Sequence, residues 1–226
     1  MKLHNINYET LLNLLIDSGY PNKNIIDNPT EKSWIIRHDV DNHLDKSVQM
    51  SKIEHDLGVT STYYLLNFDS GISEKDNYFY KDKSLKEYEL LINRGHQIGW
   101  HNNAITEHLM TKKSIIECIN TPLSYLRNNL DCYINTTASH GDRLCHKYNY
   151  INYEIWNEFE CKNNLNHERF DLKEFGFEVE AYQTNRTHYL SESGGNWRVN
   201  AYAQVQEWIE YGEGNLQILV HPQWWG

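Results

Sequence analysis

The sequence predicts an α/β fold of mainly parallel strands, formed by a single domain over residues 1–226. Strand-like and helix-like segments alternate along most of the chain, a pattern typical of parallel sheets whose strands are joined by helices. No internal repeat, low-complexity tract or linker divides the chain, and its composition, 39% hydrophobic and 23% charged, is that of a globular domain. A doubly wound nucleotide-binding sheet is the weaker alternative, because no glycine-rich GxGxxG or GxxxxGK turn follows the first predicted strand.

The first half of the chain shows the alternation most clearly. Leucine and isoleucine side chains between residues 8 and 18 form a wide apolar stripe before Gly19, which predicts a helix. Trp34-Ile35-Ile36 predicts a buried strand that continues to Asp41. The expected elements of this half are a helix at 8–18, a strand at 34–41, a helix at 43–57 that stops at Gly58, and a strand at 61–66.

The alternation continues in the second half, where the boundaries rest on capping and helix-breaking residues. Ser84-Leu85-Lys86-Glu87 has the pattern of a capping box, which predicts a helix that begins there and ends at Gly95. Pro122 is expected to separate two helical stretches around 111–130. The remaining expected elements are a strand at 96–101, a strand at 132–140, a helix at 201–211 and a strand at 216–221.

Charge and hydropathy exclude several classes of partner. The formal net charge is −10 and no run of lysine or arginine is present, which argues against nucleic acid and anionic membranes as partners. The first residues lack the apolar region of a signal peptide, and no stretch approaches the roughly 20 apolar residues of a membrane span. A cytoplasmic protein is therefore expected. Its four cysteines show no CxxC pairing and are expected to be free thiols.

Ionisable residues stand at the ends of four predicted strands. The strands end at Asp39 and Asp41, at His101, at His140 and at His221. In a (β/α) barrel the carboxyl ends of the strands meet in one mouth, where catalytic residues lie. One histidine in such a place is more often scaffold than ligand. Four such ends in one small domain favour a shared site, because buried carboxylates and imidazoles need a cation or mutual hydrogen bonds.

The spacing of two between Arg37, Asp39 and Asp41 puts these side chains on one face of an extended strand, with His38 and Val40 on the other. Two carboxylates can then share one site. One can bind a metal, and the other can act as a base on the attacking water, with Arg37 as its counter-ion. The alternative is that Arg37 and Asp39 form a purely structural ion pair.

One carboxylate and two imidazoles are a normal ligand set for Zn²⁺ or a similar divalent ion with an open coordination position. Such an ion acidifies water and polarises a carbonyl oxygen. This ligand set alone does not name the reaction, because it suits an esterase, a cyclic-amide hydrolase or an inert structural site equally well.

An ordered set of motifs covers most of the chain, from about residue 35 to its end. It comprises Ile35-Ile36-Arg37-His38-Asp39-Val40-Asp41, Ser61-Thr62-Tyr63-Tyr64, Gly95-His96-Gln97-Ile98-Gly99-Trp100-His101, Ser139-His140-Gly141, Tyr189-Leu190-Ser191-Glu192-Ser193 with Trp197-Arg198, and Val220-His221-Pro222-Gln223-Trp224-Trp225. This set resembles the polysaccharide deacetylase (NodB-homology) superfamily, in a divergent branch with RHDVD and HPxWW motifs.

The resemblance implies a distorted, incomplete (β/α) barrel, a bound divalent metal, and hydrolysis of an N-acyl group, usually acetyl, on an amino sugar. It implies that one aspartate of the first motif is the general base and the other a metal ligand. We assign Asp39 as the base and Asp41 as the ligand, and the reverse assignment stays open. It also implies that His221 protonates the leaving amine.

The sequence departs from the family pattern in two places. Val40 separates aspartates that are adjacent in the usual first motif, and Ile105 stands where the second histidine of HxxxH belongs. The remaining metal ligand must then come from elsewhere. His140, at another predicted strand end, is preferred for this position. The histidines considered and set aside are His43, His96 and His108.

The substrate is expected to be a small-molecule or oligosaccharide amino sugar. Trp224 and Trp225 follow His221 closely, so at least one of them is expected beside the site. Both tryptophans and Arg37 are predicted to bind the substrate. The alternative is that both tryptophans only cap the barrel. Two other functions stay open: a non-catalytic carbohydrate-binding or metal-stabilised scaffold, and a hydrolase of another linear or cyclic amide. A pure binding module would need neither Asp39 nor His221. The oligomeric state is not predicted.

Overall fold

The structure is a computed structural model that describes residues 7–66, 82–162, 165 and 167–225. Its contacts divide the chain into two compact units. The first unit comprises residues 1–63, 90–97 and 184–226, and the second comprises residues 64–89 and 98–183. The division falls within β2 (Thr62–Leu65) and α3 (Asp82–Asn93). That the whole chain forms a single catalytic domain stays a prediction.

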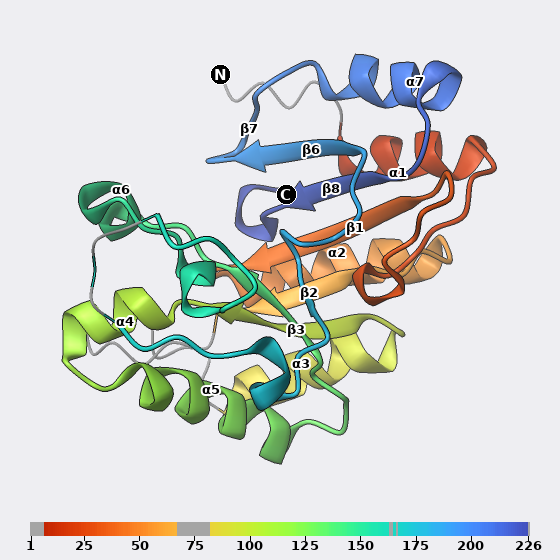
Figure 1. The fold of residues 1–226 in the computed structure, drawn as a ribbon. Helices are drawn as coiled ribbons and strands as arrows, with labels where there is room; N and C mark the ends of the chain where they lie inside the picture. Colours follow the sequence, from red (N-terminus) through yellow and green to blue (C-terminus); the bar gives the residue numbers. More distant parts are fainter. Residues whose placement is uncertain (1–6, 67–81, 163–164, 166, 226) are drawn as a thin grey trace. The chain divides into compact units, whose positions relative to one another are not determined.

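The first unit is built on parallel strands in the order β1-β8-β6, followed by the short antiparallel β7. All seven residues of β1 are buried, which is typical of a parallel strand covered on both faces. Figure 1 shows β6, β8 and β1 side by side, with α7 and α1 beside them. The elements are α1 (Tyr8–Asp17), η1 (Ile25–Asp27), β1 (Trp34–Val40), α2 (Leu44–Asp56), β6 (His188–Ser193), β7 (Asn196–Trp197), α7 (Ala201–Tyr211), β8 (Leu216–Val220) and η5 (Pro222–Trp224).

The core of the first unit forms where the apolar stripes of its helices meet the strands. Leu11, Leu12 and Leu15 of α1 are fully buried. They belong to one apolar cluster with Ile36 of β1 and Ile218 of β8. The buried face of α1 is therefore part of the stripe read from residues 8–18, since Ile16 of that stripe is 38% exposed. Burial of this face is what stabilises so short a helix.

The second unit contains the parallel strands β3, β4 and β5. Its core is aromatic: the ring of Trp100 in β3 stacks on Phe177, with centroids 5.8 Å apart, and Trp156 contacts both rings edge-on. The elements are β3 (Gln97–Asn102), α4 (Ala104–Thr111), α5 (Ile115–Asn129), β4 (Thr136–Ser139), α6 (Arg143–Tyr148), η3 (Asn152–Ile155), η4 (Leu172–Phe175) and β5 (Val179–Glu180).

The predicted fold class is confirmed: the chain is α/β, with mainly parallel strands of the incomplete (β/α)-barrel type. The helices expected at 8–18, 43–57 and 201–211 and the strands expected at 34–41, 61–66, 96–101 and 216–221 are present, each within two residues of its expected bounds. The strand expected at 132–140 is shorter and covers Thr136–Ser139.

Two helix boundaries were predicted wrongly. Pro122 does not separate two helices, because it lies inside the continuous helix α5. A proline inside a helix removes one hydrogen bond and clashes with the preceding turn. Here a capping box between Ser114 and Glu117 and the burial of the apolar face offset that cost. The other error concerns α3, which begins at Asp82, so that Ser84 lies inside the helix rather than at its start.

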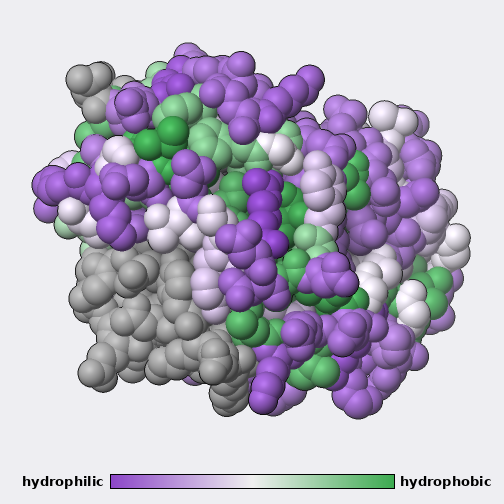
Figure 2. Space-filling view, turned by 90° about the horizontal axis from the view of Figure 1, so that it is seen from below, coloured by the Kyte–Doolittle hydropathy of each residue, from purple (hydrophilic) through white to green (hydrophobic). Residues whose placement is uncertain are grey.

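The surface agrees with the polar composition, whose mean hydropathy is −0.73. Figure 2 shows a face on which hydrophilic side chains predominate and apolar areas are small. Among the described residues, no helix combines the length and the apolar character that crossing a membrane requires.

Candidate functional site

The residues predicted for the site lie in both units. Arg37, Asp39 and Asp41 belong to the first unit, as do His221, Trp224 and Trp225, whereas His101 and His140 belong to the second. Asp39 and His101 are each the last residue but one of a strand, and Asp41, His140 and His221 directly follow strands, as the sequence predicted, whereas Arg37 lies in the middle of β1.

Successive side chains of β1 point to opposite faces of the sheet, as the spacing predicted. Arg37 Nη2 lies 3.2 Å from Asp39 Oδ2, and the two side chains are 0% and 4% exposed. On the opposite face, His38 Nε2 lies 2.7 Å from Glu54 Oε1 of α2. The guanidinium is thus a buried counter-ion for Asp39 in a place where water is largely excluded.

Asp41 follows β1 directly and is only partly buried. Its Oδ2 accepts a hydrogen bond of 3.3 Å from Gln223 Nε2, which lies in η5. A carboxylate that leaves the strand at its carboxyl end, and whose orientation is supported by an amide donor, is suitable as a metal ligand.

His221 directly follows β8 and is held by Glu192 of β6. The backbone N–H of His221 donates to Glu192 Oε2 at 3.0 Å, and Nδ1 lies 3.2 Å from the same oxygen. Burial by itself lowers the pKa of His221. The hydrogen bond with Glu192 and the charges of Asp41 and Asp39 outweigh burial and raise the pKa to about 9. These surroundings favour the protonated form of His221, which can donate a proton.

The register of the sheet explains why Asp39 affects His221. β1 and β8 are parallel neighbours, and Arg37 pairs with Leu219 and His38 with Val220. Continuing this register by one residue puts Asp39 opposite His221. Paired residues on neighbouring strands point their side chains to the same face of the sheet. The carboxylate of Asp39 and the imidazole of His221 therefore lie on one face at the same strand ends.

The second unit brings His101 and His140 together. His101 is buried in β3, and its Nδ1 lies 2.8 Å from the backbone oxygen of Ala138 in β4. His140 directly follows β4, and its Nδ1 lies 3.1 Å from Asn103 Oδ1 and 3.8 Å from Asp142 Oδ2. The two rings are nearly perpendicular, at 83°, with centroids 5.1 Å apart.

These contacts fit a metal-binding role for both histidines. A backbone carbonyl can only accept, so Nδ1 of His101 carries the hydrogen, and Nε2 is then the nitrogen with the lone pair. Histidines that bind a metal through one nitrogen commonly donate the other N–H to a carbonyl or carboxylate. Residues Asp41, His101 and His140 each offer one ligand atom of a kind that Zn²⁺ accepts.

The other histidines considered from the sequence have different surroundings. His96 is buried, with Nδ1 3.2 Å from Ser61 Oγ and Nε2 3.1 Å from the backbone oxygen of Ser51. It is a packing residue, as expected. His108 Nδ1 lies 2.6 Å from the backbone oxygen of Lys113, and His43 precedes α2 in the left-handed conformation, with φ of 53°.

The tryptophans at the end of the chain differ in exposure. Trp225 is buried, and its ring contacts Tyr8 and Trp197 edge-on, with centroids 5.5 and 5.9 Å away. Trp224 is partly buried and packs against the apolar cluster of the first unit. These contacts are those of packing residues. A role of either ring in substrate binding stays a prediction.

Sequence reasoning missed Glu192, which holds His221. Its strand, β6, was not recognised from the hydrophobic pattern, although the segment Tyr189-Leu190-Ser191-Glu192-Ser193 belongs to the resemblance. A signal was present: Leu190 and Glu192 are two residues apart and both buried, as expected for one face of a strand. A buried carboxylate on such a face needs a charged or hydrogen-bonding partner.

A second missed feature is a buried polar cluster around Glu54 of α2. Its carboxylate accepts hydrogen bonds from the hydroxyl groups of Tyr8, Tyr63 and Ser61, at 2.6 Å from Tyr63 and 2.8 Å from Ser61. It also contacts the imidazole of His38. The cluster joins α1, α2, β1 and β2 behind the strand that carries Asp39.

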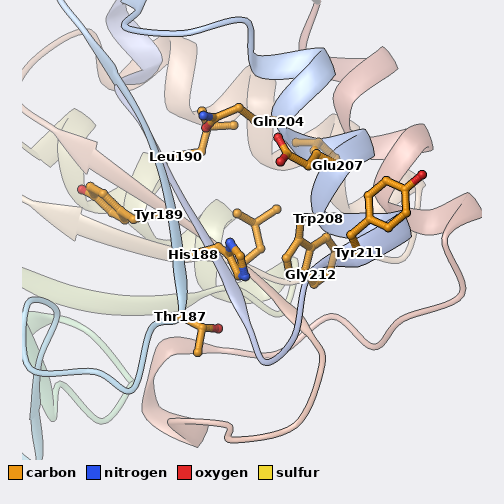
Figure 3. A pocket seen from close by; sticks show the side chains of 11 residues that line it. Thr187, His188, Tyr189, Leu190, Gln204, Glu207, Trp208, Tyr211 and Gly212 are labelled. Carbon is orange, nitrogen blue, oxygen red and sulfur yellow. The ribbon is translucent and has the colours of Figure 1, made fainter.

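The first unit also contains a pocket of about 400 Å³ between α7 and the amino-terminal ends of β6 and β8. Figure 3 shows Gln204 and Glu207 of α7 on one side of it and His188 of β6 on the other. None of the predicted site residues lines this pocket. It lies at the opposite end of β8 from His221 and is separate from the predicted site.

No protein-family model matches the chain, and no curated protein does. Among solved structures, the chain is similar to a family 4 carbohydrate esterase from Bacillus anthracis, with 9% identity, a TM-score of 0.44, and coverage of 93% of this chain and 76% of that one. A likeness with so low a TM-score carries no argument about the site.

Proposed function

We propose that the protein is a metal-dependent hydrolase that removes an N-acyl group, such as acetyl, from an amino sugar in a small molecule or oligosaccharide. The observation that carries the proposal is the pairing of a carboxylate and a protonated imidazole on one face of β1 and β8. Asp39 has a buried arginine as counter-ion, and Glu192 helps to raise the pKa of His221 to about 9.

The proposed reaction needs two proton transfers. Asp39 takes a proton from the attacking water as the oxygen bonds to the acyl carbon. His221 gives its proton to the nitrogen as the C–N bond breaks, so that the amine leaves neutral and the acyl group leaves as a carboxylic acid. The raised pKa of His221 suits this role, because an acid must hold its proton at the working pH.

We further propose that Asp41, His101 and His140 bind one divalent ion, Zn²⁺ being the best fit to two imidazoles and a carboxylate. The ion would polarise the acyl oxygen and acidify water. The Nδ1 contacts of both histidines support the assignment, since they direct Nε2 to the ligand role. The ordered motifs that resemble the polysaccharide deacetylase superfamily support the amino-sugar substrate.

The function is tested by incubating the full chain, metal-free or loaded with Zn²⁺, with N-acetylated and N-formylated amino sugars and their short oligomers. Released acetate or formate is then measured. We expect release from the loaded protein and its loss on chelation. Failure of the loaded protein to release acid from any of these substrates would contradict the proposal.

The ligands are tested by metal analysis of Asp41→Asn, His101→Ala and His140→Ala. Each is expected to lower the Zn²⁺ affinity, whereas His188→Ala, a histidine in the separate pocket, is a matched control and should keep it. If His140→Ala retained full stoichiometry and affinity, that ligand assignment would be wrong.

A further inference from the structure

The orientation of one buried asparagine, Asn152, is fixed by its neighbours. Its Oδ1 lies 3.0 and 3.3 Å from the backbone nitrogens of Ile105 and Thr106, at the start of α4. Its Nδ2 lies 2.8 Å from the backbone oxygen of His140. Backbone N–H groups can only donate and a backbone carbonyl can only accept, so the oxygen and nitrogen of this amide cannot be exchanged.

That orientation fixes the next amide. Asn152 Nδ2 also lies 3.1 Å from Asn103 Oδ1. Because Asn152 presents a donor, the atom of Asn103 that faces it must be the oxygen. A reversed Asn103 would put two NH₂ groups against each other and leave buried donors unsatisfied, which costs on the order of 1–3 kcal/mol.

The oxygen of Asn103 in turn fixes His140. His140 Nδ1 lies 3.1 Å from Asn103 Oδ1, which can only accept. In the neutral imidazole Nδ1 must therefore carry the hydrogen, and Nε2 carries the lone pair. Asn103 is 5% exposed and Asn152 0%, so water has little access to replace either contact.

We infer that Asn152 and Asn103 are positioning residues that hold His140 as the Nδ1–H tautomer and thereby select Nε2 as its metal-binding atom. The inference rests on the proposed function only in taking His140 as a ligand. The series of hydrogen bonds begins at the backbone N–H groups in the first turn of α4. One of these groups belongs to Ile105, which stands at the position of the second histidine of the HxxxH motif in the family that the sequence resembles. In this chain the backbone of that turn acts through the two asparagines to orient the ring of His140.

The tautomer is measured first, in the metal-free full chain. Two-bond ¹H–¹⁵N spectra distinguish Nδ1–H from Nε2–H imidazoles, and comparison with His140→Ala identifies the signals of His140. We expect the Nδ1–H form in the wild type and in Asn103→Asp, which keeps an acceptor oxygen. Asn103→Leu keeps the branched shape of the side chain without an acceptor and should raise the population of the Nε2–H form. An Nε2–H imidazole in the wild type overturns the inference without any variant.

Metal affinity is the second readout, by competition of Zn²⁺ with a chromophoric chelator. We expect Asn103→Leu to bind roughly 10–100-fold more weakly, the usual effect of losing such a support, and Asn103→Asp to recover most of the loss. Asn135→Leu is the matched control: Asn135 is a buried asparagine of the same unit that donates to Glu178 at 2.8 Å, and its loss should leave the affinity unchanged.

The two proposals fail separately. If His140→Ala does not weaken Zn²⁺ binding, the ligand assignment of the proposed function is wrong, and the tautomer spectra alone decide the role of Asn103. If His140→Ala weakens binding but Asn103→Leu changes neither the affinity nor the tautomer, the metal site stands and the positioning role is overturned.

Discussion

The carboxylate of Glu192 accepts hydrogen bonds from the backbone N–H of His221 and, across 3.2 Å, from its Nδ1. This contact both orients the ring and stabilises its protonated form, since an anion beside an imidazolium favours the charged state. Burial alone would lower the pKa of His221, so the raised value of about 9 depends on Glu192 together with Asp41 and Asp39.

Replacing Glu192 by glutamine should therefore lower the pKa of His221. If His221 acts in its protonated form, the alkaline limb of kcat/KM is set by the loss of its proton, and this limb should move to lower pH in Glu192→Gln. The pH profile of acyl release measures the shift. Glu207→Gln removes a carboxylate from the separate pocket and is the control. An alkaline limb that stays in place in Glu192→Gln would show that His221 is not the acid.

For individual residues, the sequence shows which of them end a strand, but it does not show which side chains hold them by hydrogen bonds. Asp39, Asp41, His101, His140 and His221 could be found because each stands at the end of an apolar or β-branched run. Glu192, Asn103 and Asn152 act on residues 29, 37 and 12 positions away, respectively. No local pattern encodes those distances, so these supporting residues could be recognised only in the fold.

Among the elements, those with a clear apolar period were predicted best. The helices α1, α2 and α7 follow from apolar stripes, and β1 and β8 follow from short, mainly apolar runs. The error at Pro122 arose because local helix breaking was outweighed by the burial of α5. The short strands β5 and β7, with two residues each, have no sequence period to detect.

The Glu54 cluster joins four elements and should contribute strongly to stability. Removing a buried charged hydrogen-bond partner leaves its buried neighbours unsatisfied and costs about 1–3 kcal/mol, or more where the group is charged. Glu54→Gln keeps the volume but removes the charge, and we expect it to lower the free energy of unfolding by about this amount at neutral pH. Urea denaturation measures it. A loss well below 1 kcal/mol would contradict the role of the cluster.

The same cluster predicts a dependence on pH. Burial by itself raises the pKa of Glu54, but the charge and hydrogen bond of His38, with further contributions from His96 and Tyr63, lower it from 4.5 to about 2. A group whose pKa is lower in the folded state stabilises the protein above its unfolded value and loses that contribution as the pH falls through the folded value. The difference in stability between wild type and Glu54→Gln should therefore shrink between about pH 4.5 and pH 2.

For the whole molecule, the sequence predicted the α/β class and the parallel strands, because alternation of elements is a property of the entire chain. The residues assigned to chemistry come from segments as distant as 37–41, 101, 140 and 221. Catalysis of the proposed kind requires all of them to act on one acyl group. The net charge of −10 gives no electrostatic attraction for polyanions.

The central claim is that Asp39 and His221 carry the two proton transfers of an N-acyl hydrolase. The most direct measurement is the turnover of Asp39→Asn and His221→Ala on an N-acetylated amino sugar, with metal content determined on the same samples. The account predicts a fall in kcat of roughly 10²–10⁴-fold for each, with the Zn²⁺ stoichiometry unchanged. Loss of the metal in Asp39→Asn, with its retention in Asp41→Asn, would reverse the two aspartate roles. Turnover that is intact in both Asp39→Asn and His221→Ala would contradict the account.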